Sequence, residues 1–177
     1  MHRIPVFSVL VALVLVSFPG LASAQHDNDA KSKIKNALAA APTAIAEGAT
    51  VVDWDQTVLR EGSNGWVCLP DGGSGPMCLD GEWQSWAHAW IGHTKPDVKK
   101  VGTAYMLHGG KDASNTDPFA TEPAAGEDWI ISGPHVMIIV PDPSSLDDLP
   151  SDPNSGGPYV MFQGTPYAHI MMPVGDR

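Results

Sequence analysis

Apolar residues recur at helical spacing in two parts of the chain, and these parts are the predicted helices. The first pattern runs over residues 34–45, where Pro42 breaks or restarts the helix. The second runs over residues 82–91, with Asp80 placed to cap its start and Gly92 its end. Tryptophans repeat on one face of this second helix, so we expect that face to be buried.

Short apolar segments separated by Pro, Gly, Asp and Ser make up most of the remaining chain, and they predict strands. The predicted fold class is therefore α+β, dominated by a mostly antiparallel sheet, with one or two helices packed on one face. Two long connections, residues 109–127 and 141–158, are rich in turn residues. The predicted strands are residues 50–59, 66–69, 101–108, 128–140 with a break at 133–134, 159–163 and 167–174.

Residues 1–24 contain a positively charged start, an apolar run over residues 4–18 and a small-residue cleavage signature, Ala22-Ser23-Ala24. This order is typical of a secretory signal peptide, and the run is shorter than the about 20 residues of a membrane-spanning helix. We therefore expect a single secreted or periplasmic domain over residues 25–177, with no membrane anchor after cleavage of the signal peptide.

Cys68 and Cys78 are the two cysteines of the chain. In an oxidising compartment we expect them to form a disulfide that closes the Gly- and Pro-rich segment 69–77. The alternative, a redox or metal-binding thiol pair, lacks the close CxxC spacing. The formal net charge of −10 argues against nucleic acids and anionic membranes as partners. A small ligand or a metal ion is compatible with this charge, and the sequence does not fix the oligomeric state.

Two predicted strands carry the same short pattern, His-x-Met, at residues 135–137 and 169–171. Side chains two apart in a strand share a face, so each strand presents one imidazole and one thioether on the same side. A third segment, Met106-Leu107-His108, has this spacing in reverse order. If residues 164–166 form a three-residue hairpin loop, Met161 lies directly opposite the second histidine.

Thioether sulfur together with imidazole suits copper, above all Cu(I), so copper is the cofactor that these patterns predict if the strands converge. Ordinary core packing is the alternative, because Met is common in cores and a single strand histidine is usually a hydrogen-bonded structural residue. The leading hypothesis is a small binding protein with a His/Met copper site. Its candidate ligands are His108, His135, His169, Met106, Met137, Met161 and Met171.

A second hypothesis makes the chain an enzyme. In residues 50–59, Thr-Val-Val-Asp-Trp-Asp-Gln-Thr-Val-Leu, apolar residues precede a DxDxT pattern. This segment resembles the first motif of the haloacid-dehalogenase-like phosphatases, and residues 137–148 resemble the acidic magnesium-binding motif that closes such a site. The resemblance implies that Asp53 is a nucleophile toward phosphorus and Asp55 a general acid. It also implies a parallel sheet with alternating helices, whereas residues 101–142 have almost no helical pattern.

A third hypothesis is a structural or carbohydrate-binding module. Aromatic rings can form a platform for sugars or other planar ligands, although tryptophans at helical spacing are more often core residues. The loops at residues 114–118 and 151–154 offer oxygen ligands for Ca²⁺, and they are equally good plain turns. The residues that carry the platform hypothesis are Trp54, Trp66, Trp83, Trp86, Trp90 and Trp129.

Overall fold

The computed structural model describes residues 20–111, 113–123 and 129–176 of the chain. The predicted signal peptide over residues 1–24 therefore falls largely outside the described residues. Among the described residues, no helix combines the length and the apolar character that crossing a membrane requires.

The described residues form three helices, and the first of them begins at Gly20, well before the predicted start at residue 34. Helix α1 (Gly20–Leu38) is followed by the short α2 (Thr43–Ala46), and the two are separated at Pro42, as expected. Helix α3 (Gly81–Ile91) begins at Asp80, whose carboxylate accepts a hydrogen bond from the Trp83 backbone N–H at 2.9 Å. Such a cap satisfies a backbone donor that has no partner inside the helix. The predicted start of this helix is confirmed.

Eight strands form one sheet in the order β2-β1-β3-β4-β5-β8-β10-β9, in which the β1–β3 pair is parallel and every other neighbouring pair is antiparallel. This confirms the α+β class with a mostly antiparallel sheet. A separate two-stranded sheet contains β6 (Ala113–Ser114) and β7 (Trp129–Ile130). The strands of the large sheet are β1 (Thr50–Val52), β2 (Val58–Arg60), β3 (Val67–Leu69), β4 (Met77–Leu79), β5 (Gly102–Met106), β8 (His135–Ile139), β9 (Tyr159–Met161) and β10 (His169–Pro173).

The structure differs from the predicted strands most over residues 50–79. The run 50–59 is not one strand, because β1 and β2 form a hairpin in which the Asp53 N–H donates to the Thr57 carbonyl at 2.8 Å. Strand β3 pairs with β1 in parallel, so it is not the returning arm of a hairpin. Strand β4 lies in the segment that was expected to be only a loop and its closing cysteine.

Cys68 and Cys78 form the predicted disulfide, with an S–S distance of 2.01 Å. They lie directly opposite one another on β3 and β4, so the bond joins two neighbouring strands. Both side chains are fully buried against the end of α1 and the residues that follow it. The bond therefore fixes the middle of β4 beside β3.

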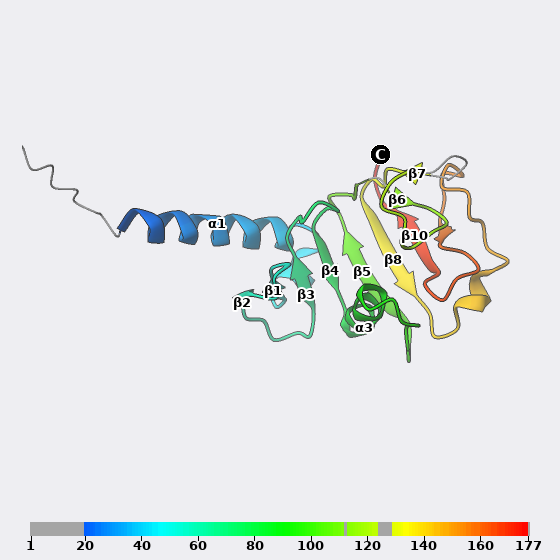
Figure 1. The fold of residues 1–177 in the computed structure, drawn as a ribbon, viewed down its shortest axis with the longest axis horizontal. Coiled ribbons are helices and arrows are strands. Elements are labelled where there is room, and N and C mark those ends of the chain that lie inside the picture. The colour runs from blue at the N-terminus through cyan, green and yellow to red at the C-terminus, as the bar shows by residue number, and fades with distance from the viewer. Residues whose placement is uncertain (1–19, 112, 124–128, 177) are drawn as a thin grey trace, which may run out of the picture.

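The helices cover different parts of the sheet (Figure 1). We call the side of the sheet on which α3 packs the front face. Gly102 of β5 permits the close approach of α3, because an added Cβ at Gly102 would lie 2.7 Å from Glu82 Cβ. Residues of β6 and β7 pack against the same front core. The end of α1 and the α2 region cover the rear face at β1, β3 and β4, while the rest of α1 extends away from the sheet.

Candidate functional site

The front face of β5, β8, β10 and β9 carries most of the candidate ligands in three rows, because antiparallel strands place side chains opposite one another. The two outer rows each contain one histidine, and we call them the His135 row and the His169 row. In order, the rows are Met106, His135 and Pro173; then Ala104, Met137, Met171 and Tyr159; then His169 and Met161.

The predicted pairing of Met161 with His169 is confirmed by the β9–β10 register. The connection between the strands is wider than predicted, because residues 162–168 lie outside both strands. Phe162 has a positive φ of 58°, and its carbonyl accepts hydrogen bonds from the N–H and the hydroxyl of Thr165. The turn therefore begins at Phe162, before the predicted loop of residues 164–166. The pairing of Met161 with His169 is nevertheless the predicted one.

The structure keeps His135 and His169 apart. Pro173, at the far end of β10 from His169, is the residue opposite His135. At about 3.3 Å per residue, the backbones of the two histidines lie about 13 Å apart along the strand direction, while their rings are near enough for His135 to contribute to the lowered pKa of His169. They therefore belong to separate environments at opposite ends of the front face.

His135 is positioned as a neutral imidazole at the start of β8. It is 3% exposed, and its Nδ1 lies 2.7 Å from the carbonyl oxygen of Gly133. A carbonyl only accepts hydrogen bonds, so Nδ1 donates the proton and Nε2 carries the lone pair. Burial lowers the pKa of the His135 ring, which is therefore neutral at pH 7. Neutral imidazole is the form that binds metals.

A small cavity lies beside His135, with a volume of about 10 Å³. This volume corresponds to about one atom of the size of a water oxygen. Met171 and Tyr159 are among its lining residues, so a histidine and a methionine border the same space. The other lining residues are Ser132, Gly133, Pro173 and Gly175.

Met106 brings a second thioether to the His135 row. It lies directly opposite His135 and is 6% exposed. Gly110 covers both side chains, because a Cβ at Gly110 would lie 3.4 Å from Met106 Cε and 3.9 Å from His135 Cε1. Met171 is the diagonal neighbour of His135, at a typical separation of about 7–8 Å that a long side chain can span. Met106 and Met171 thus lie on the strands either side of His135, and of the two it is Met171 that lines the cavity.

His169 is enclosed by aromatic rings. Its ring centroid lies 5.3 Å from Trp83, 5.6 Å from Trp86 and 5.4 Å from Phe162, in edge-to-face arrangements. Its Nδ1 lies 3.0 Å from the carbonyl oxygen of Tyr167. Burial lowers the pKa of His169 to about 4. These contacts are those of a core histidine that fills space and satisfies its own hydrogen bond.

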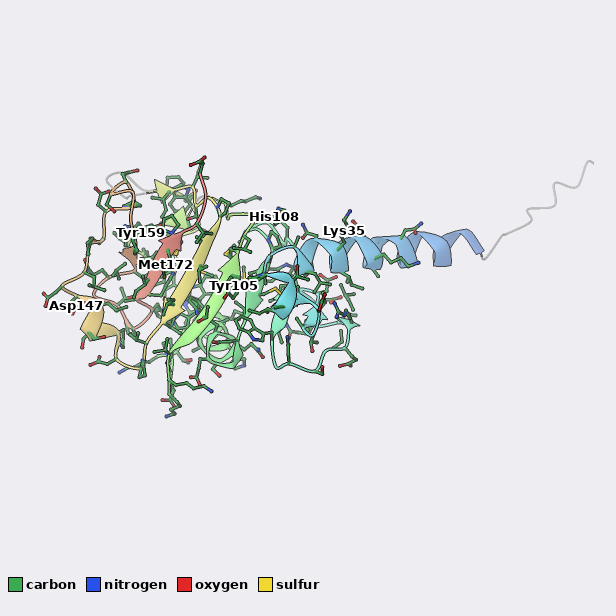
Figure 2. The ribbon with its side chains drawn as sticks, turned by 180° about the vertical axis from the view of Figure 1, so that it is seen from behind. Lys35, Tyr105, His108, Asp147, Tyr159 and Met172 are labelled. Atoms are coloured by element: carbon green, nitrogen blue, oxygen red, sulfur yellow. A yellow bond between two sulfur atoms is a disulfide. The ribbon has the colours of Figure 1, made fainter. Side chains whose placement is uncertain are left out.

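The remaining candidate ligands do not join either histidine directly. Met137 is buried in the middle row, beside Met171. His108 lies beyond the end of β5 and is exposed (Figure 2). Within the described parts of the chain, no group of three or more His, Cys, Asp or Glu residues could hold a metal. A metal on the front face would therefore depend on thioether sulfur.

The DxDxT segment forms the turn between β1 and β2. Asp53 makes an ion pair with Lys33 at 2.8 Å, and this hydrogen-bonded contact lowers the pKa of Asp53. Asp55 accepts a hydrogen bond from the Thr57 N–H at 2.9 Å, which lowers the pKa of Asp55. Both carboxylates thus hold the turn and its contact with α1.

The second acidic segment of the phosphatase resemblance lies at the opposite end of the sheet. Its 3₁₀ helix η1 (Pro143–Leu146) packs against residues of β9 and β10, whereas β1 is near the other edge. Figure 2 shows Asp147, directly after η1, far from Lys35 of α1. The structure does not bring the two acidic motifs together, and the sheet is not the parallel one that the resemblance implies.

The six tryptophans are distributed over the two faces of the large sheet, a turn and the small sheet. Trp83 and Trp86 are buried in the front core. Trp90 stacks on Trp86 with centroids 6.4 Å apart, is 38% exposed, and donates from Nε1 to the Pro118 carbonyl at 2.7 Å. The others are Trp54 in the β1–β2 turn, Trp66 against the rear core, and Trp129 in β7.

The two loops that offered oxygen ligands for Ca²⁺ lie side by side. Asn115 Nδ2 donates to the Ser151 carbonyl at 2.9 Å and so joins them. The carboxylates of Asp117 and Asp152 each accept a hydrogen bond from a backbone N–H two residues further on, both at 2.8 Å. These are the contacts of ordinary Asx turns.

The sequence patterns did not indicate one further thioether, that of Met77. It lies in β4, inside the segment that the disulfide closes, where no strand was predicted. Its place near the candidate ligands follows only from the pairing of β4 with β5, in which the neighbouring Cys78 lies opposite Tyr105.

No protein-family model matches this chain, and no curated protein or solved structure is significantly similar to it.

Proposed function

We propose that this chain is a small exported binding protein that holds one Cu(I) ion between the His135 row and Met171 of the middle row. The ligands in this proposal are Nε2 of His135 and the sulfur atoms of Met106 and Met171. The observation that carries it is the cavity beside His135, which also has Met171 in its wall. The His169 row has the same two residue types, but aromatic rings occupy the space around its imidazole.

The chemistry of the proposed donor set favours Cu(I) over harder cations. Thioether sulfur and neutral imidazole are soft or intermediate ligands, whereas Zn²⁺ gains little from a thioether. The hydrogen bond from His135 Nδ1 to the Gly133 carbonyl orients the ring, as carbonyl partners commonly do for metal-binding histidines. The donors carry no charge, so a monovalent cation leaves less charge in this buried site than a divalent one.

Export is the part of the proposal that the disulfide supports. Disulfides persist in oxidising compartments and are rare in the cytosol. The Cys68–Cys78 bond is therefore compatible with the leader-like pattern of residues 1–24.

The proposal is tested by titrating the purified protein anaerobically with Cu(I) in competition with bicinchoninate. We expect about one equivalent to bind more tightly than micromolar, and Zn²⁺ to compete poorly. His135→Ala should weaken binding by at least about tenfold, and Met171→Leu by less. His88→Ala is the matched control, because His88 is exposed on α3.

Two results would count against the proposal. Binding weaker than micromolar in the wild type would remove the copper site. Equal affinity in His135→Ala and His88→Ala would place any copper elsewhere in the chain. Thermal unfolding of each variant without metal controls for loss of the fold.

A further inference from the structure

We propose that Met77 is the first ligand for incoming Cu(I), and that it passes the ion along the front face to Met106 and His135. This inference rests on the proposed function, because it assigns the access route of the same site. The observation that carries it is the position of Met77 on β4, where it extends the His135 row by one strand.

The sheet register places Met77 beside the proposed ligands. Strand β4 pairs with β5 so that Cys78 lies opposite Tyr105 and Leu79 lies opposite Ala104. Continuing this antiparallel register by one residue places Met77 opposite Met106. Because side chains alternate, Met77 shares the front face with Leu79, and it packs against the same front core. The row therefore runs Met77, Met106, His135 across three neighbouring strands.

Burial increases along this row. Met77 is partly exposed, Met106 is 6% exposed and His135 is 3% exposed. Adjacent side chains of a row lie about 4.5–5.5 Å apart at Cβ, within the reach of a flexible methionine. Each sulfur can therefore reach an ion held by the next residue, and Met77 is the most exposed residue of the three.

Backbone loops cover the side chains of Met106 and His135. The Gly110 N–H donates to the Ser132 carbonyl at 2.8 Å, directly above the Met106 and His135 side chains. Gly75 approaches Gly109 so closely that a Cβ at Gly75 would lie 2.3 Å from the Gly109 oxygen. An ion arriving from above would have to open these loop contacts. Met77, two residues after Gly75, is the partly exposed member of the row.

The transfer is a ligand exchange without a change of oxidation state. A Cu–S bond to Met77 forms as a ligand of the donor complex leaves, and a Cu–S bond to Met106 then forms as the Met77 bond breaks. The copper stays Cu(I) throughout. A thioether carries no ionisable proton, so no proton is released when Met77 binds.

The test compares the rate and the affinity of Cu(I) transfer from the bicinchoninate complex, followed by stopped-flow absorbance under anaerobic conditions. Met77→Leu keeps the side-chain volume and removes the sulfur. We expect it to slow uptake by about fivefold or more and to slow release in proportion, so that affinity changes little. Met172→Leu is the matched control, since Met172 is also partly buried but lies on the rear face.

Each alternative outcome is decisive. Unchanged uptake in Met77→Leu, with normal binding in the wild type, overturns the access route and leaves the His135 site standing. A loss of affinity in Met77→Leu as large as in His135→Ala makes Met77 a permanent ligand and also overturns the route. Absence of Cu(I) binding in the wild type removes the route together with the proposed function. Met77→Gln, which keeps the length without sulfur, should behave as Met77→Leu does.

Discussion

The His135 row and the His169 row share a histidine opposite a methionine on the same face of the same sheet. In both, Nδ1 lies within hydrogen-bonding distance of the carbonyl oxygen two residues earlier, that of Gly133 or of Tyr167. They differ in what covers them. Loops rich in glycine lie over His135 and leave a cavity, whereas Trp83, Trp86 and Phe162 enclose His169. The same pair of residues thus has one environment suited to binding and another suited to packing.

The largest expected difference between the two rows is in the free energy of unfolding without metal. His169→Ala removes a ring in contact with three aromatic side chains and should cost about 3–4 kcal/mol. His135→Ala removes a ring that already borders a cavity, and should cost about half as much. Urea unfolding at pH 7.5 measures both. Equal losses would show that the two environments are energetically alike.

Lowering the pH should reveal the burial of His169 in a second way. The pKa of His169 is about 4 in the folded protein and about 6.5 in the unfolded chain, so below pH 6.5 the unfolded chain binds a proton that the folded protein does not. The contribution of neutral His169 to the free energy of unfolding is complete above pH 6.5. It falls by about 3 kcal/mol as the pH is lowered to 4. The lowered pKa of His135 acts in the same direction.

His169→Phe tests this pH dependence, because it keeps an aromatic ring and removes the titrating group. Unfolding free energies from pH 7.5 to 4 should fall less steeply in this variant than in the wild type. Carboxylates titrate in both proteins, so the difference between the two curves isolates His169. Parallel curves would contradict the assignment.

Removing the disulfide should affect the His135 row more than the His169 row. Cys68→Ala with Cys78→Ala opens a short loop and should cost about 2–3 kcal/mol. The bond holds β4, which borders β5 and the outer end of the His135 row. Hydrogen exchange should therefore accelerate at residues 102–110 and change little at residues 167–172. Uniform acceleration across both segments would show that the rows are not independent.

The smallest effect is expected far from both rows. Asp53→Asn breaks an ion pair with Lys33, which is 40% exposed, and should change the unfolding free energy by less than about 1 kcal/mol. It should leave Cu(I) affinity unchanged. Magnesium-dependent phosphate release from small esters that disappears in this variant would instead favour the enzyme hypothesis.

Features set by neighbouring residues could be predicted from the sequence. The break at Pro42, the Asp80 cap, the disulfide and the Met161–His169 register depend on patterns of a few residues or on one hairpin. The turn inside residues 50–59 was missed, because the Val and Trp residues around it have high strand propensity. Strand β4 was missed because its partners, β3 and β5, supply its hydrogen bonds.

The two histidine environments could not be predicted, because they depend on strand order and on cover. The His-x-Met alternation correctly places His135 with Met137 and His169 with Met171 on one face. It contains no information on how far β10 is shifted along β8, and that shift separates the imidazoles. The loops over His135 come from residues distant in the chain, such as Gly75 and Gly110.

X-ray absorption at the copper edge of the Cu(I)-loaded protein tests most directly whether the His135 row is the metal site. We predict one imidazole nitrogen and two sulfur ligands around the copper, with the imidazole signal lost in His135→Gln and kept in His88→Ala. The sulfur cannot come from the cysteines while their disulfide is intact. A spectrum with two imidazoles, or one without sulfur, would contradict a site built from His135, Met106 and Met171.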